Sequence, residues 1–169
     1  MFVIGERTNG MFTAIGDAIL AKDPLPIRAM AEKQIAAGAN ALDINVGTRV
    51  PKAERPAVMQ WLVATTREVT DICLAIDTPS LEVMRVGLEA ACRKGPGMIN
   101  STTGQADKLG AFMKLAREFN ARIIGLAIDE NGVPPRRTPK SKSACACWPP
   151  PWTLVFPQMR SIWIPSPCR

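Results

Sequence analysis

The sequence contains no histidine, and this absence excludes several kinds of active site. Without an imidazole the chain cannot build a Ser-His-Asp triad, a Cys-His pair or the commoner zinc sites. Its five cysteines form no CxxC pair. Cys73 and Cys92 lie in apolar patterns typical of buried thiols, and the lone CxC of Cys145 and Cys147 indicates a metal only weakly. We therefore predict no metal site.

Signals for phosphate binding and for membrane insertion are also missing. No GxGxxG follows the first apolar run, and the chain has no P-loop. No apolar run approaches the length that crosses a bilayer. The opening stretch "MFVIGER" lacks the pattern of a secretory signal peptide. We expect a cytoplasmic protein without a membrane segment.

Acidic residues are missing from the end of the chain. Residues 1–135 carry 15 Lys and Arg against 15 Asp and Glu, whereas residues 136–169 carry only basic charges, which account for the net +6. A strongly basic balance is often a sign of nucleic-acid binding. Because the balanced body of the chain has no basic stripe, we expect no nucleic-acid partner.

Short apolar runs alternate with longer segments of helical spacing. The runs are typical of strands buried on both faces, and they cover 1–5, 41–46, 72–77, 97–101 and 122–128. The segments between them place apolar residues on one helical face, and they cover 24–37, 54–71, 80–93 and 105–120. This order predicts an α/β fold with a parallel sheet of five strands and four helices. It fits either an open doubly wound sheet or an arc of a (βα)8 barrel.

Polar side chains gather where the predicted strands end. In both architectures ligands bind at the carboxyl ends of parallel strands. Carboxylates and carboxamides there would suit a heterocycle with ring N–H, amino and carbonyl groups. The candidate site residues are Glu6, Asn9, Asp43, Asn45, Asp77, Asn100 and Ser101.

Helix capping is the alternative role for a polar residue after a strand. Asp77, which is followed by Thr-Pro-Ser, could cap the next helix. Asp43 and Asn45 are harder to explain in this way, because they lie inside an apolar strand. Burying each of them costs roughly 1–3 kcal/mol unless a partner or a ligand satisfies it.

Five stretches in order carry a recognisable pattern: VIGERTNGMF (3–12), AAGANALDINVG (36–47), LAIDT (74–78), MINST (98–102) and ARIIGLAID (121–129). Together they resemble the pterin-binding methyltransferases. This family includes the methyltetrahydrofolate:corrinoid/iron-sulfur protein methyltransferases and the folate module of cobalamin-dependent methionine synthase, and it shares its barrel with dihydropteroate synthase. The resemblance covers about residues 1–134, roughly the N-terminal half of such a domain. NGMF and LDINVG favour the branch that acts on corrinoid proteins, and the Asn-Val-Thr-Pro-Asp-Ser-like loop of dihydropteroate synthase is absent.

The resemblance implies a (βα)8 barrel and a methyltransferase that moves the N5-methyl group of methyltetrahydrofolate to the cobalt of a corrinoid. The corrinoid would be carried by a partner, a corrinoid iron-sulfur protein, and the intact enzyme would be a homodimer. Asp77 and Asn100 match family positions that bind the pterin, with Asp43 and Asn45 on the same rim. Protonation of N5, or a hydrogen bond to it, improves the amine leaving group. A polar network that includes Asn100 as the candidate catalytic residue would act there, so the chemistry requires no histidine.

The strand-helix pattern stops after the fifth predicted strand, although a (βα)8 barrel takes about 250 residues. We predict a half-barrel over residues 1–134 and an irregular tail, rich in Pro, Trp and Cys, over residues 135–169. Read one base out of frame, Trp148-Pro149 must encode Ala and Trp163-Ile164 must encode Asp. The neighbouring codons then permit a helix followed by an Asp-Pro-Leu strand end like that of the family. A shifted reading frame is our hypothesis for the tail; a basic interaction arm and a partner-docking segment are the alternatives.

Three functions are consistent with these observations. The leading hypothesis is transfer of the methyl group of methyltetrahydrofolate to a corrinoid protein. The alternatives are a dihydropteroate synthase-like pterin enzyme and a non-catalytic, truncated remnant. Because the pattern lacks strands six to eight, the hypothesis includes an incomplete pocket. Whether this chain catalyses the reaction by itself is left open.

Overall fold

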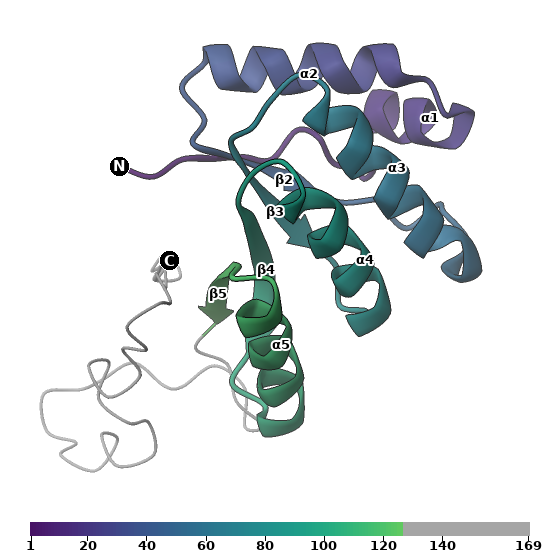
Figure 1. Cartoon of the computed structure of the whole chain (residues 1–169). Helices are drawn as coiled ribbons and strands as arrows, with labels where there is room; N and C mark the ends of the chain where they lie inside the picture. The colour runs from purple at the N-terminus through teal and green to yellow at the C-terminus, as the bar shows by residue number, and fades with distance from the viewer. Residues whose placement is uncertain (127–169) are drawn as a thin grey trace, which may run out of the picture.

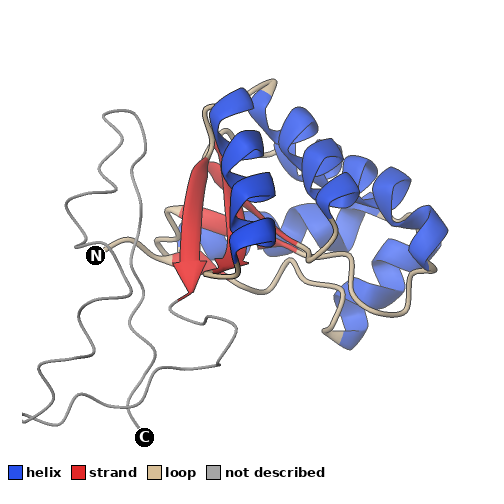
Figure 2. Ribbon diagram, turned by 90° about the horizontal axis from the view of Figure 1, so that it is seen from below, coloured by secondary structure: helices blue, strands red, loops and turns tan. Residues whose placement is uncertain are grey.

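The computed structural model describes residues 1–126, which form one parallel sheet and a layer of helices (Figures 1 and 2). The strands are β1 Ile4–Gly5, β2 Ala41–Ile44, β3 Cys73–Asp77, β4 Gly97–Thr103 and β5 Arg122–Leu126. The helices are α1 Thr13–Ala21, α2 Pro24–Ala36, α3 Arg55–Arg67, α4 Leu81–Cys92 and α5 Ala106–Glu118, with a short 3-10 helix, η1, at Lys52–Glu54. The predicted tail at 135–169 and the end of the fifth predicted strand lie outside the described residues. The predicted domain division at residue 134 stays a prediction.

The strand order shows which parallel architecture the chain adopts. The strands lie in the order β1-β2-β3-β4-β5, and each pair of neighbours is parallel. A doubly wound sheet reverses its strand order at a switch point and carries helices on both faces. Here the order follows the chain without a reversal, and the helices follow one another along one side of the sheet (Figure 1). The described part is therefore an arc of a barrel of the TIM type.

Alternate residues of the strands belong to two apolar clusters on opposite faces of the sheet. The larger cluster joins the helix-facing residues of the strands to residues from all five α-helices; its strand members include Leu42, Ile44, Leu74, Ile76, Ile99 and Ile123. The smaller cluster lies on the other face and consists of Ala41, Cys73, Ala75, Met98 and Ile124, with Ile4 packed against it. Burial on both faces explains why the strands read as continuous apolar runs.

Four of the five α-helices were predicted, and their ends agree with the prediction to within a few residues. Helix α1 was not predicted, although its buried apolar residues have helical spacing, because it is short and lacks a capping signal. It spans nine residues, includes Gly16, and begins at Phe12 without a side-chain cap. Its buried apolar residues hold it in the larger apolar cluster, and Arg49 adds bonds from a distant segment, to Asp17 Oδ1 at 2.7 Å and to the carbonyl oxygen of Thr13 at 3.3 Å. A Cβ at position 16 would collide with the Arg49 guanidinium, so glycine leaves room for this contact.

A buried arginine ties the helices together at the end of the sheet where the strands begin. The Arg67 guanidinium donates to the carbonyl oxygens of Ile72 at 2.5 Å, Ala91 at 3.0 Å and Pro96 at 3.0 Å. Ile72 and Pro96 immediately precede β3 and β4, and Ala91 lies in the last turn of α4. Burial lowers the pKa of this guanidinium. The bonds bring a charged donor to carbonyl groups beside the ends of α4, β3 and β4, where the carbonyl of Pro96 also accepts the backbone N–H of Leu74 at 3.1 Å.

Replacing this arginine should destabilise the fold. In Arg67→Met the apolar stem is kept, but three carbonyl oxygens lose a charged donor, and a hydrogen bond to a charged group contributes about 1.5–3 kcal/mol. We expect urea denaturation to show a free energy of unfolding lower by about 3 kcal/mol or more. Arg93→Met is the matched control, because exposed Arg93 pairs with Glu89 one turn away and should lose at most about 0.5 kcal/mol. Equal losses in the two variants would contradict this role of Arg67.

Candidate active site

The carboxyl ends of the strands bring five of the seven predicted site residues together. Strand residues alternate between faces. The face that points away from the helices therefore carries the smaller apolar cluster and, at the strand ends, Asp43, Asn45, Asp77 and Asn100. Asp77 lies opposite Asn100 in the register of β3 and β4, and Asn9 forms a bridge with Asn45. We call these five residues, Asn9, Asp43, Asn45, Asp77 and Asn100, the rim cluster.

Asp43 is the shared acceptor of the rim cluster. Its side chain is buried, with 3% of the residue exposed. Asn9 Nδ2 donates to Asp43 Oδ2 at 3.2 Å, and Asn100 Nδ2 donates to Asp43 Oδ1 at 3.0 Å. Both carboxylate oxygens therefore have a partner, as expected for a polar residue inside an apolar strand.

Asp77 belongs to the rim cluster and is not the cap of the next helix. Asn45 Nδ2 donates to Asp77 Oδ2 at 2.7 Å, which turns the carboxylate toward the neighbouring strand. The N-cap of α4 is Ser80, whose Oγ accepts from the backbone N–H of Val83. The capping alternative raised by the sequence is thus wrong for Asp77, because Ser80 occupies that position.

Glu6 and Ser101 lie outside this hydrogen-bonded group. Glu6 is exposed just after β1, and it acts on Asp43 only through its charge. Ser101 follows Asn100 in β4 and is half-buried. Within residues 1–126 neither side chain makes a hydrogen bond to the rim cluster. Their predicted role in substrate binding remains a prediction.

The loops that carry Asn9 and Asn45 pack backbone against backbone. The N–H of Gly10 donates to the carbonyl oxygen of Asn45 at 2.8 Å. A Cβ on Gly10 would lie 2.4 Å from the Val46 carbonyl oxygen, and one on Gly47, which has φ +78°, would lie 2.7 Å from Gly10. The glycines after each Asn therefore allow the close approach that aligns the two amides.

Sequence reasoning missed the residues that anchor the first of these loops. Gln34 of α2 is buried; its Nε2 donates to Thr8 Oγ1 at 3.0 Å, and its Oε1 accepts from the Arg7 backbone N–H at 2.7 Å. A signal was present, since Gln34 is a polar residue beside Ile27 and Ala31 on the apolar side of its helix. This contact holds the loop in place just before Asn9.

Burial and neighbouring charge raise the pKa of Asp43 from 3.8 to about 7. Desolvation is the largest cause, and the Asp77 carboxylate adds to it, because two negative charges repel each other. The hydrogen bonds from Asn100 and Asn9 act in the opposite direction, and Glu6 raises the pKa slightly further. Asp43 therefore changes its charge near neutral pH.

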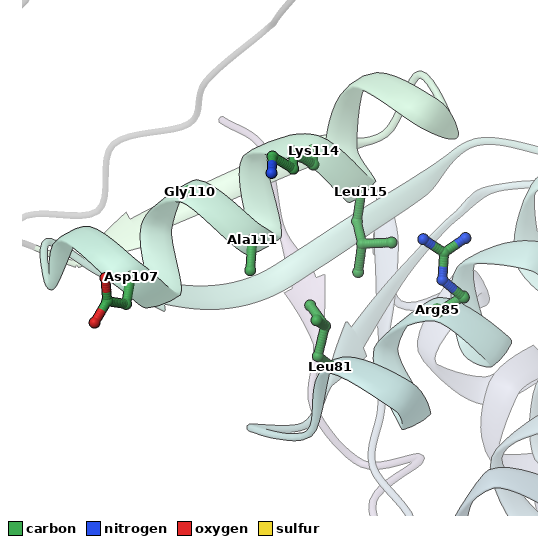
Figure 3. Close-up of a pocket in the computed structure, with 7 residues that line it drawn as sticks. All are labelled: Leu81, Arg85, Asp107, Gly110, Ala111, Lys114 and Leu115. Atoms are coloured by element: carbon green, nitrogen blue, oxygen red, sulfur yellow. The ribbon is translucent and has the colours of Figure 1, made fainter.

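A cavity of about 460 Å³ lies elsewhere, between α4 and α5 (Figure 3). Leu81 and Arg85 line it from α4, and Asp107 and Lys114 line it from α5. It lies among the helices and contains none of the predicted site residues, so the rim cluster, not this cavity, remains the candidate site.

Residues 1–126 contain neither a group of metal ligands nor a helix that could span a membrane. In that part of the chain no three His, Cys, Asp or Glu side chains are grouped so that they could hold a metal ion. The same residues include no helix with both the length and the apolar character needed to cross a membrane.

Substituting Gly47 should disturb the site, and Gly38 offers a matched control. Both have positive φ, so Ala at either position is strained by about 1–3 kcal/mol. Gly38 has nothing within 4 Å of an added Cβ, whereas Gly47 meets Gly10. We expect Gly47→Ala to lower the free energy of unfolding by about 1–3 kcal/mol more than Gly38→Ala. Urea denaturation measures both, and equal losses would show that the two loops can separate without cost.

The buried carboxylate makes stability depend on pH. The fold raises the pKa of Asp43 from 3.8 to about 7. The stability that depends on protonated Asp43 is therefore fully present below pH 3.8, the pKa in the unfolded chain, and is lost as the pH rises toward 7. The wild-type free energy of unfolding should fall by about 1.4 kcal/mol per pH unit from this group over that range. Asp43→Asn should lack this fall, and Asp71→Asn, an exposed carboxylate paired with Lys94, should keep it. Urea denaturation between pH 4 and 8 tests the difference, and a wild-type slope in Asp43→Asn would refute it.

Comparison with known proteins agrees with this geometry. Residues 8–145 match the family described as pterin binding enzyme. The chain is also 30% identical over 136 residues to a methylcorrinoid:tetrahydrofolate methyltransferase of Eubacterium limosum. That alignment covers 79% of this chain and 49% of the relative, so the chain spans about half the length of the curated relative it matches. The resemblance read from the sequence is confirmed at the level of the family, and the chain belongs to the pterin binding enzymes.

Proposed function

We propose that the rim cluster binds the pterin ring of a folate and forms part of a methyltransferase site. The observation that carries the proposal is the pairing of Asp77 with Asn45 and of Asn100 with Asp43 at adjacent strand ends. These pairs turn a carboxylate and a carboxamide to the same rim. The family match and the relative's name support the same conclusion.

The remaining hydrogen-bonding capacity of the rim suits a pterin. Asp77 Oδ1 and Asn100 Oδ1 accept no hydrogen bond from residues 1–126, whereas Asp77 Oδ2 and Asn100 Nδ2 are engaged. A pterin carries an amino group and a ring N–H along one edge, and both are donors. Carboxylate and carbonyl oxygens are acceptors for such an edge, and the charged one forms the stronger bond.

Methyl transfer is the proposed reaction. The corrinoid, held by a partner corrinoid protein, would supply the cobalt that exchanges the methyl group with N5 of the folate. The residues of this chain would bind and orient the pterin, and their amides and carboxyls would hold a proton or a hydrogen bond near N5. Asn100 is the residue proposed to contribute to that network.

The proposed direction, from methyltetrahydrofolate to cobalt, is opposite to the one in the relative's name, which gives methylcorrinoid before tetrahydrofolate. Both directions pass through the same transition state, so one site serves either. The homodimer and the cytoplasmic location remain predictions from the sequence.

Calorimetry with the whole 169-residue chain tests the binding site. We expect methyltetrahydrofolate to bind, and Asp77→Ala and Asn100→Ala each to weaken binding by about 10- to 100-fold, the effect of one lost hydrogen bond that involves a charged or well-oriented group. Asp71→Ala is the matched control, since it removes a carboxylate that precedes β3 at the opposite end of the sheet. It should leave the affinity unchanged.

Two results would overturn the proposal. A wild-type chain that does not bind methyltetrahydrofolate, although folded by circular dichroism, would favour the non-catalytic remnant. Condensation of para-aminobenzoate with a pterin pyrophosphate would favour a dihydropteroate synthase-like enzyme.

A further inference from the structure

Two of the three amides in the rim cluster have a fixed orientation. An Asn side chain offers one carbonyl acceptor and two N–H donors. Asn9 donates to Asp43 and accepts the backbone N–H of Met11 at 2.9 Å. Asn45 donates to Asp77 and accepts the backbone N–H of Gly47 at 2.7 Å. Because a backbone N–H can only donate, it keeps each of these carbonyl oxygens facing it.

Asn100 has no such backbone donor within residues 1–126. Its Nδ2 donates to Asp43 Oδ1 at 3.0 Å, and no group among residues 1–126 donates to its Oδ1. The bond to Asp43 is therefore the contact that orients this amide. An ionised carboxylate can only accept, so it draws the N–H group toward itself and leaves the carbonyl of Asn100 on the other side.

A proton on Asp43 reverses this preference. When the proton is on Oδ1, which faces Asn100, this O–H group donates, and the Asn100 carbonyl becomes its acceptor once the amide has rotated by half a turn; Oδ2 continues to accept the N–H of Asn9. The Asn9 amide does not rotate in the same way, because its carbonyl oxygen accepts the backbone N–H of Met11. The protonation state of Asp43 therefore acts selectively on Asn100.

We propose that Asp43 is a proton-dependent positioning residue that sets whether Asn100 presents a carbonyl acceptor or an N–H donor to the ligand. The inference rests on the pterin site proposed above and deepens it. With Asp43 ionised, the Asn100 carbonyl faces the amino and ring N–H groups of the pterin. With Asp43 protonated, an N–H of Asn100 faces those donors, and binding weakens.

The surroundings of Asp43 place this switch near neutral pH. In the described part of the chain, the charged groups that act on it are both acidic: Asp77 from β3 and Glu6 from the segment after β1. The facing groups from the first loop and from β4 are the neutral amides of Asn9 and Asn100. Burial and this like charge raise the pKa of Asp43 to about 7, so both protonation states are populated near neutral pH.

Nuclear magnetic resonance of the ligand-free, whole chain tests the switch directly. The side-chain amide signals of Asn100 should shift with a midpoint near pH 7 in the wild type, and this transition should be absent in Asp43→Asn. Asp71→Asn is the matched control and should titrate like the wild type. A flat Asn100 signal in the wild type, or a transition that persists in Asp43→Asn, overturns the proposal.

The pH dependence of methyltetrahydrofolate affinity tests its consequence. A single proton that must leave Asp43 predicts about a tenfold weaker wild-type affinity at pH 6 than at pH 8. Asp43→Asn should lose this dependence while still binding, and Asn100→Ala should lose it as well, because Asp43 acts through Asn100. Subtracting the Asp43→Asn profile removes any titration of the ligand itself.

The outcomes separate the two proposals. If the wild-type chain does not bind at any pH, the proposed function fails, and the amide titration still decides whether Asp43 controls Asn100. If the wild type binds with the same pH profile as Asp43→Asn, only the switch fails. If a folded Asp43→Asn loses binding at every pH, Asp43 contacts the ligand directly and the positioning role is wrong.

Discussion

A carboxylate buried inside an apolar strand is the constraint on which the candidate site depends. Asp43 lies in the middle of β2, where burial would be costly without partners. Its partners come from the loop after β1 and from β4, so satisfying one side chain joins three parts of the chain. The same bonds place Asn9 and Asn100 at the rim. The hydrogen bonds that satisfy Asp43 therefore also arrange the candidate binding site.

The two ends of the sheet carry different kinds of polar interaction. Where the strands begin, Arg67 of α3 donates to backbone carbonyls, and these bonds connect α3 to α4 and to the starts of β3 and β4. Where the strands end, Asp43 and Asp77 lie close enough for each charge to oppose the other. Such repulsion lowers stability and perturbs a pKa, and both effects are typical of functional sites. This division agrees with the barrel fold, in which ligands bind at the carboxyl ends of the strands.

Close backbone packing gives the rim its geometry. Gly10 and Gly47 follow the two Asn residues whose amides are fixed, and each lies where a side chain would collide with the opposite loop. The loops therefore support one another, and Gln34 anchors the first of them to α2. Among residues 1–126 Asn100 has no backbone partner of this kind, and its bond to Asp43 is the contact on which the proposed switch depends.

The sequence by itself determined the alternation of strands and helices, the polar residue types at the strand ends and the family. These features follow from local periodicity, composition and motif order, which need no knowledge of long-range contacts. Helix α1 was not identified from the sequence; it is a short helix without a side-chain cap that is held by the burial of its apolar residues in the larger cluster. The sequence did not show whether Asp77 caps a helix, since the answer depends on Ser80 and Asn45 together.

Only the tertiary structure decided the architecture and the pairing of the site residues. Strand order separates a barrel from a doubly wound sheet, and this order is a relation between segments far apart in the chain. The bonds of the rim cluster join residues separated by 32, 34 and 57 positions. No local pattern encodes which amide meets which carboxylate, because that choice is made by strand register and by the approach of two loops. For the same reason the sequence grouped Glu6 and Ser101 with the rim cluster, whereas the fold leaves both outside its hydrogen bonds.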